Sequence, residues 1–342
     1  MITDTLATLV EGSDLSRDAM VALMESIMTG GATPAQIGAA LTALRIKGET
    51  VTEIAAAAEV MRNLAAKVEV SATHLVDLCG TGGSGTSKFN VSTASALVAA
   101  GAGIQVAKHG NRAASGKSGS ADVLEAAGVH LDLTPAQVGQ CIETVGVGFL
   151  FALNHHGAMR HAIGPRKELK FRTMFNLLGP LTNPAGTKRQ VLGVFDAAWL
   201  WPLAEVLREL GSEQVMVVHA DDGLDELSIA APTRVVELKD GDLREYEVCP
   251  EDVGLMFQSW EDLRVENSQE SLALVKAALT GEHAAARDFV AFNAGAAIYV
   301  GGGSVSLAEG VERAKDSIAS GAAKEKLNLL IEFTQQLRVL DP

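Results

Sequence analysis

Residues 75–95 read LVDLCGTGGSGTSKFNVSTAS, and this stretch decides the fold. A short apolar run ends in six residues that include four glycines, and a helical pattern of small residues follows. This order predicts a strand, a glycine-rich loop and a helix. Backbone amides, hydroxyls and a helix N-terminus at one point favour a phosphate or pyrophosphate site, although a flexible turn with a helix cap is the alternative. The stretch matches neither the P-loop nor the GxGxxG fingerprint.

Short apolar runs alternate with helical patterns after residue 70. This alternation predicts an α/β domain with a central, mostly parallel sheet and helices on both faces. Asp240-Gly241 lies between two alternating runs in residues 234–248 and predicts a hairpin. Helical patterns return from residue 268. The candidate strands are Leu75–Leu78, Ile104–Ala107, Val147–Ala152, Gln190–Phe195 and Gln214–His219, and the candidate helices between them are residues 92–101, 120–127, 135–144 and 199–210.

The first part of the chain shows only helical patterns. Residues 16–29 carry apolar side chains on one face. Thr33-Pro34 and the capping-box spacing of Thr50 and Glu53 predict the starts of two more helices. We therefore expect a small helical domain at residues 1–68 and an α/β domain at residues 69–342.

Composition limits the classes of function. The 342 residues include 28 Lys and Arg against 42 Asp and Glu, which gives a net charge of −14. This charge disfavours a nucleic-acid-binding protein but permits a local basic pocket. The three cysteines lack metal-ligand spacing, and no signal peptide or apolar span is recognisable, so we expect a cytoplasmic protein.

Three further polar segments follow candidate strands, where ligands bind in parallel sheets. Residues 108–120 read KHGNRAASGKSGS, and their cations, serines and glycines predict a second anion-binding loop rather than a solvated surface loop. Residues 154–166 contain three histidines and Arg166, which could line a pocket for an aromatic carboxylate or be ordinary helix residues. Adjacent histidines point apart on a helix, and no HExxH is present, so a histidine metal site is disfavoured.

The fourth segment is acidic. Residues 221–226 read DDGLDE and place four carboxylates in one turn. Mg²⁺ binds a few carboxylates together with substrate phosphate oxygens, so this turn beside two anion loops predicts a magnesium site. The alternative is a solvated turn on an acidic protein.

Taken together, these motifs resemble those of the anthranilate phosphoribosyltransferases. The resemblance rests on GTGGSG, NVSTAS, KHGNRAASGKSGSADVLEAAG, GFLFALNHHGAMR, FRTMFNLLGPLTNPA and HADDGLDELS, which span nearly the whole chain in order. It implies transfer of a phosphoribosyl group from phosphoribosyl pyrophosphate (PRPP) to anthranilate, with two magnesium ions and a homodimer formed through the helical domain. It also implies that a hinge at about residues 165–185 joins the two domains. The family usually has Asp where this chain has Ser84, which leaves the details of metal and PRPP binding open.

The resemblance also implies a role for individual residues. Those implied in catalysis are Lys108, Asn111 and Arg166. Those implied in PRPP binding are Gly80, Gly83, Ser84, Lys88, Asn90, Val91, Ser92, Thr93, Lys108, His109, Gly110, Asn111, Arg112, Ser115, Gly116 and Ser120. Those implied in anthranilate binding are Gly80, His109, Asn111, His156, Arg166 and Pro180, and those implied in metal binding are Ser92, Asp225 and Glu226.

Two other functions remain open from the sequence. A pyrimidine nucleoside phosphorylase would share the architecture, but its signature KHSTGGVGD is missing from this chain. A non-enzymatic paralogue that binds nucleic acid would need a basic surface, which the net charge of −14 disfavours.

Overall fold

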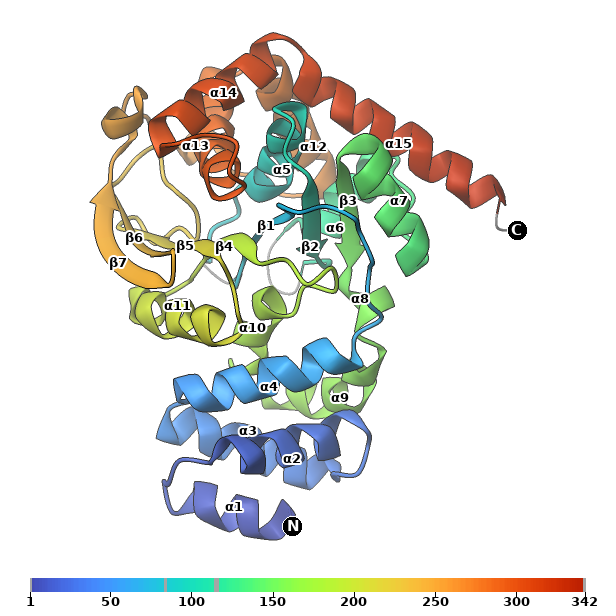
Figure 1. Ribbon diagram of the computed structural model, residues 1–342, viewed down its shortest axis with the longest axis vertical. Coiled ribbons are helices and arrows are strands. Elements are labelled where there is room, and N and C mark those ends of the chain that lie inside the picture. Colours follow the sequence, from blue (N-terminus) through green and yellow to red (C-terminus); the bar gives the residue numbers. More distant parts are fainter. Residues whose placement is uncertain (1, 83–84, 114–116, 341–342) are drawn as a thin grey trace.

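The chain forms four N-terminal helices, then a seven-stranded sheet with helices on both faces (Figure 1). The computed structural model describes residues 2–82, 85–113 and 117–340. The strands are β1 Val76–Gly80, β2 Val106–Gly110, β3 Val147–Phe151, β4 Arg189–Gly193, β5 Gln214–Ala220, β6 Thr233–Lys239 and β7 Asp242–Val248. The helices are α1 Ile2–Val10, α2 Arg17–Met28, α3 Pro34–Lys47, α4 Val51–Leu64, α5 Val91–Gly101, α6 Ser120–Ala127, α7 Pro135–Val145, α8 Ala152–His155, α9 Arg160–Leu169, α10 Phe175–Leu178, α11 Leu200–Glu209, α12 Ser268–Thr280, α13 Ala284–Val300, α14 Leu307–Ala319 and α15 Ala322–Leu340.

The sheet order is β3-β2-β1-β4-β5-β6-β7. Strands β1 to β5 are parallel, whereas β6 and β7 add an antiparallel edge. Asp240 and Gly241 have φ angles of 54° and 87°, as the tight turn between β6 and β7 requires. The predicted fold class is confirmed. β1 has β2 on one side and β4 on the other, so the strand order reverses beside β1.

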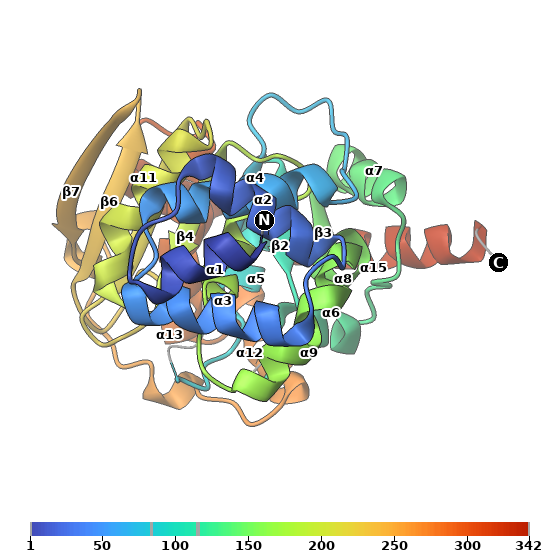
Figure 2. The same ribbon diagram turned by 90° about the horizontal axis from the view of Figure 1, so that it is seen from below.

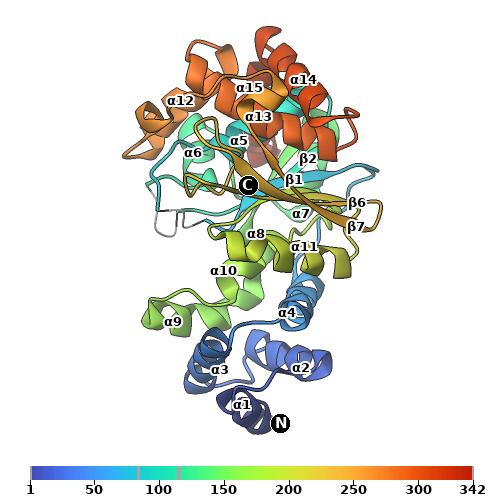
Figure 3. The same cartoon turned by 90° about the vertical axis from the view of Figure 1, so that its left-hand side faces the viewer.

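The N-terminal helices begin where their capping residues predict. The side chain of Thr33 accepts a hydrogen bond from the backbone N–H of Gln36, and Pro34 is the first residue of α3. Thr50 and Glu53 form the predicted capping box at the start of α4. The structure adds one helix for which the sequence analysis made no prediction, α1. These four helices form a separate layer, seen end-on in Figure 3.

A later segment of the chain returns to this helical layer. Helix α9 packs against α2 and α3 (Figure 2), and α10 packs against α4 (Figure 1). Alternating residues of strand β5 enter two different cores. Met216 and Val218 of β5 pack with α5 and the C-terminal helices, while Val215 and Val217 pack in a core that runs on into the helical layer. The second core therefore joins the helical layer to one face of the sheet.

Within the described residues, no helix is both long enough and apolar enough to cross a membrane.

Candidate active site

The site lies at the carboxyl ends of β1 and β4, where the strand order reverses. Gly80 and Gly193 are the last residues of these strands and pair in parallel register. A β-carbon at Gly80 would lie 2.5 Å from the Oδ2 atom of Asp225, and one at Gly193 would lie 1.7 Å from the carbonyl oxygen of Asp225. The close atom at Gly193 belongs to the backbone, so only glycine at this position lets the acidic turn after β5 lie directly on the end of β4. This location is the usual ligand site of an open α/β sheet.

The four carboxylates of the acidic turn have different surroundings. Asp222 accepts hydrogen bonds from the hydroxyl of Ser228 at 2.6 Å and from the indole of Trp260 at 2.8 Å. Asp221 is exposed. Asp225 and Glu226 instead line the cavity above the strand ends. The turn thus contributes two carboxylates to the site and uses a third to hold its own shape.

Lys88 is the cationic partner of these two carboxylates. Its ammonium nitrogen lies 2.9 Å from Asp225 Oδ1 and 2.7 Å from Glu226 Oε2, and all three side chains are almost fully buried. Burial opposes the charge on Lys88, but the two carboxylates outweigh it and raise the lysine's pKa. Burial also opposes ionisation of Asp225, yet Lys88 holds its pKa below the usual value. Burial and the charge of Asp225 together raise the pKa of Glu226.

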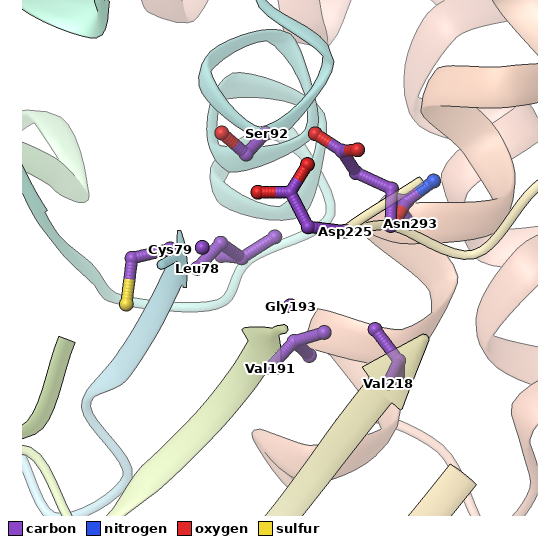
Figure 4. Close-up of a pocket in the computed structure, with 10 residues that line it drawn as sticks. Leu78, Cys79, Ser92, Val191, Gly193, Val218, Asp225 and Asn293 are labelled. Atoms are coloured by element: carbon purple, nitrogen blue, oxygen red, sulfur yellow. The ribbon is translucent and has the colours of Figure 1, made fainter. Parts of the chain in front are cut away.

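The start of helix α5 forms another wall of the cavity. Ser92 in its first turn lines the cavity, on the same side as Asp225 (Figure 4). Asn90, just before the helix, donates to the carbonyl of Ser118 at 3.1 Å and accepts from the hydroxyls of Ser118 and Ser271. Asn90 therefore ties the glycine-rich segment to the end of the second anion loop and to α12.

The segment predicted as a second anion loop, residues 108–120, starts within β2, because Lys108, His109 and Gly110 are the last residues of this strand. Lys108 donates to the carbonyl of Leu78 at 2.6 Å, and the backbone N–H of His109 donates to Asp77 at 3.0 Å. Burial raises the pKa of Asp77 although the Lys108 ammonium opposes this. Gly110 ends β2, and the hydroxyl of Ser120 donates to the carbonyl of Asn111 at 3.3 Å. The end of this segment at Ser120 therefore lies beside the end of β2.

The guanidinium of Arg112 is directed to helix α6. It contacts Glu125 at 2.7 Å and Asp122 at 3.1 Å and lies 5.6 Å from the centroid of the Phe151 ring. Its side chain lines a different cavity from that of Asp225, one that also reaches α15. The structure therefore does not bring the Arg112 side chain to the acidic turn, and its role in PRPP binding stays a prediction.

Two buried histidine rings lie side by side. The ring centroids of His109 and His156 lie 5.2 Å apart. Burial lowers the pKa of His156 to about 4 and that of His109 well below its usual value, so both rings are neutral near pH 7. The Nε2 atoms of both rings are buried without a hydrogen-bond partner among the described residues. His155 points elsewhere, with Nδ1 2.8 Å from the carbonyl of Ala66.

Arg166 lies in α9, with its guanidinium 5.0 Å from the centroid of the Phe175 ring. Burial lowers its pKa, and no carboxylate lies within ion-pair distance of it in the described parts of the chain. Pro180 follows α10, is buried, and its carbonyl accepts from Gln190 at 2.8 Å. A desolvated guanidinium without an acidic neighbour is suited to binding a carboxylate ligand.

The candidate residues therefore fall into groups. Gly80, Lys88, Ser92, Asp225 and Glu226 meet at the acidic cavity, and His109 contacts His156. Val91 and Thr93 are buried in the first turn of α5. Asn111 is exposed and accepts from the backbone N–H of Arg112 at 2.8 Å. Gly83, Ser84, Ser115 and Gly116 lie outside the described residues.

Sequence reasoning missed residues that shape the site without carrying a motif. Gly193 ends an ordinary apolar strand, and Asn293 lies far along the chain. Asn293 accepts from the backbone N–H of Leu227 at 3.0 Å and donates to its carbonyl at 2.9 Å, which fixes the end of the acidic turn. Neither the close approach at Gly193 nor the hydrogen bonds of Asn293 can be recognised from the local sequence.

The donor set fits magnesium. Asp225, Glu226 and Ser92 offer oxygen ligands around one cavity. Over the described residues, no group of three or more His, Cys, Asp or Glu side chains could hold a metal ion by itself. Magnesium commonly takes one or two protein carboxylates and completes its shell with water and substrate phosphates, so a site with two carboxylates suits it when a phosphate-bearing ligand is present.

Comparisons with known proteins agree with this geometry. Residues 3–65 match the helical bundle domain of the glycosyl transferase family, and residues 72–324 match its a/b domain. The anthranilate phosphoribosyltransferase of Thioalkalivibrio sulfidiphilus (strain HL-EbGR7) is 61% identical over 321 residues, which are 94% of this chain and 95% of the relative.

Solved structures are similar over the same length. The crystal structure of anthranilate phosphoribosyltransferase from Thermus thermophilus matches with a TM-score of 0.92 and 45% identity, covering 97% of this chain and 99% of that one. The Saccharomyces cerevisiae enzyme in complex with PRPP and Mg matches with a TM-score of 0.88 and 26% identity, covering 98% of each chain. The resemblance found in the sequence motifs is thus confirmed, and the chain belongs to the anthranilate phosphoribosyltransferase family.

Proposed function

We propose that this protein transfers the phosphoribosyl group of PRPP to the amine of anthranilate, giving N-(5-phosphoribosyl)anthranilate and pyrophosphate in tryptophan biosynthesis. The observation that carries the proposal is the acidic turn at the strand-order reversal, with Asp225 and Glu226 beside the start of α5. An acidic turn next to two anion-binding loops suits a magnesium-bound pyrophosphate. Family membership over almost the whole chain supports the same reaction.

The chemistry follows from charge. Pyrophosphate leaves C1 of the ribose, which develops oxocarbenium character, and the arylamine attacks C1 from the opposite face. An aromatic amine is neutral at pH 7, so the reaction needs no strong general base. Magnesium, when bound, neutralises charge on the leaving pyrophosphate, and Asp225, Glu226 and Ser92 would hold two such ions. The helix N-terminus at Val91 adds a partial positive charge on the same side.

Residues from the end of β2 and from the segment between β3 and β4 would provide the second half of the site. Arg166 would bind the carboxylate of anthranilate, and Asn111 and Pro180 would help to position its ring. The neutral rings of His109 and His156 would exclude water from the reacting carbon, because burial keeps them uncharged. Lys108 would reach PRPP by exchanging its bond to the carbonyl of Leu78 for a phosphate oxygen. Holding both substrates in line supplies much of the remaining rate.

A fluorescence assay tests the function. We expect anthranilate fluorescence to fall only when PRPP and Mg²⁺ are both present, and excess EDTA should stop the reaction. Phosphate-dependent cleavage of thymidine in the same preparation would instead support the nucleoside phosphorylase alternative. Full turnover in excess EDTA would contradict the magnesium role, and no loss of anthranilate under any condition would contradict the function.

We also propose that the protein is a cytoplasmic homodimer that pairs through its helical layer, with residues 165–185 as a hinge. Val10 and Ile46 in this layer are 75% and 81% exposed, which leaves apolar surface uncovered on the single chain. We expect light scattering at micromolar concentration to give the mass of two chains. Ile46→Lys should shift the mass toward one chain, whereas Val305→Lys, at an exposed position before α14, should not. A monomer mass for the unmodified protein would contradict this prediction.

A further inference from the structure

Lys88 occupies the space between the two carboxylates that would bind metal. Its ammonium lies 2.9 Å from Asp225 Oδ1 and 2.7 Å from Glu226 Oε2. The other oxygen of Asp225 faces the end of β1, where a β-carbon on Gly80 would approach it to 2.5 Å. Lys88 therefore contacts one oxygen of each carboxylate that would bind metal.

Backbone hydrogen bonds hold the chain in place on both sides of Lys88, so only the lysine side chain can move away from the two carboxylates. Lys88 forms an antiparallel bridge with Arg264. The N–H of Phe89 donates to the carbonyl of Leu263 at 3.1 Å, and that of Val265 donates to the carbonyl of Ser87 at 2.7 Å. These bonds on both sides of the lysine hold its α-carbon beside the acidic turn. The four-carbon side chain can still rotate, because a lysine ammonium is a point charge on a flexible stem.

An ammonium and a divalent cation exclude each other at this position. Magnesium binds carboxylate oxygens at about 2.0–2.1 Å, so an ion shared by the two oxygens would nearly coincide with the Lys88 nitrogen. A cation beside it would also be repelled by the lysine's charge, which is screened little in a buried site. Metal binding to this pair therefore requires the lysine to move.

We propose that Lys88 is an internal cation that holds the acidic turn in the metal-free protein and that a divalent ion must displace it. This inference rests on the proposed function, because it assumes that Asp225 and Glu226 bind metal. Lys88 then weakens metal binding to the free protein. The displaced ammonium becomes available to the pyrophosphate of PRPP, so PRPP and metal each favour the binding of the other.

The test is direct metal binding without PRPP. Mn²⁺, followed by electron paramagnetic resonance, should bind Lys88→Met more tightly than the unmodified protein, by roughly 5- to 150-fold, the usual range for coupling between two sites. Lys88→Arg keeps the cation and should stay as weak as the unmodified protein. The matched control is Lys188→Met, which removes a lysine that lies 3.4 Å from Glu213. Lys188 precedes the first residue of β4, at the opposite end of that strand from Gly193. This variant should leave the Mn²⁺ affinity unchanged.

Thermal unfolding gives a second readout. Lys88→Met leaves two buried carboxylates without a cation, so in EDTA its melting temperature should fall below that of the unmodified protein. Mn²⁺ should raise the melting temperature of Lys88→Met by more than it raises that of the unmodified protein. If Lys88→Met folds only with metal, recovery of its native circular dichroism on adding Mn²⁺ supports the proposal, and failure to recover contradicts it.

The outcomes separate this inference from the proposed function. Equal Mn²⁺ affinities of Lys88→Met and the unmodified protein, or weaker binding by the variant, would overturn the role of Lys88 while PRPP-dependent loss of anthranilate still stood. An unmodified protein that consumes no anthranilate would overturn the proposed function whatever the Mn²⁺ affinities were.

Discussion

Gly193→Ala should nearly abolish phosphoribosyl transfer and destabilise the fold. The substitution adds only one methyl group, and it does so in β4, which contributes no side chain to the reaction. The added carbon would lie 1.7 Å from the carbonyl oxygen of Asp225 and 2.5 Å from its carbonyl carbon. Both atoms belong to the backbone and cannot rotate away, so the acidic turn must lift from the end of β4. Asp225 and Glu226 would then lose their positions relative to Ser92.

The expected loss follows from two effects. Misplacing one preorganised group at a reacting centre commonly costs roughly 10²–10³-fold in rate. Overpacking a tight contact typically costs about 1–3 kcal/mol of stability. We therefore expect a fall in kcat/KM of at least about 10²-fold, together with a lower midpoint of urea unfolding.

Steady-state kinetics and urea unfolding check this prediction. The control is Gly38→Ala in helix α3, where a new β-carbon meets no atom within 4 Å, and it should keep full activity. Retention of normal activity by Gly193→Ala would show that the acidic turn is not required at its observed position. A loss of stability without a loss of activity, measured where the variant is folded, would lead to the same conclusion.

The sequence predicted those features that depend on local signals. Thr33-Pro34 and the Thr50–Glu53 box set helix starts through contacts three residues apart, and the structure shows both. Asp240-Gly241 predicted a hairpin because two residues with positive φ are needed there. The alternation of short apolar runs with helices predicted a mostly parallel sheet, because helices cover both faces of such a sheet and its strands are therefore apolar on both sides.

Features that depend on close approach between distant segments had no such signal. Lys88 and Asp225 are 137 residues apart in sequence, so a lysine in a candidate anion loop gave no hint of its buried carboxylate partners. Gly193 could have been any small strand residue until the turn at residue 225 was placed against it. The requirement for glycine at this position comes from the three-dimensional fold and from no property of the strand itself.

The ion pairs of Arg112 do have a local sequence signal. It lies ten and thirteen residues before Asp122 and Glu125, which are three residues apart on α6 and so share one face. A cation in the preceding loop could therefore have been expected to pair with that face. The carboxylates that follow in the same segment neutralise its charge, so Arg112 is not a free cation for an anionic ligand.

Arg166→Ala should raise the KM for anthranilate far more than the KM for PRPP. Burial lowers the pKa of this arginine, and among the described residues it has no carboxylate within ion-pair distance. A guanidinium in such a place has lost part of its hydration without gaining a protein anion, and the anthranilate carboxylate would supply the missing partner. PRPP would instead be held at the acidic cavity and the phosphate loops, so its binding should change little.

Removing one partner of a buried charge pair typically costs about 2–4 kcal/mol, which corresponds to roughly 30- to 1000-fold in affinity. Varying each substrate at a saturating level of the other measures the two KM values. Arg166→Lys should recover only part of the loss, because a lysine keeps the charge but cannot form two parallel hydrogen bonds with a carboxylate. The control Arg160→Ala removes an exposed arginine from the same helix and should leave both KM values unchanged. Comparing the two variants separates the loss of a carboxylate-binding group from a general disturbance of α9. Equal increases in both KM values for Arg166→Ala would mean that this arginine acts on the closure of the whole site and does not bind the aromatic substrate.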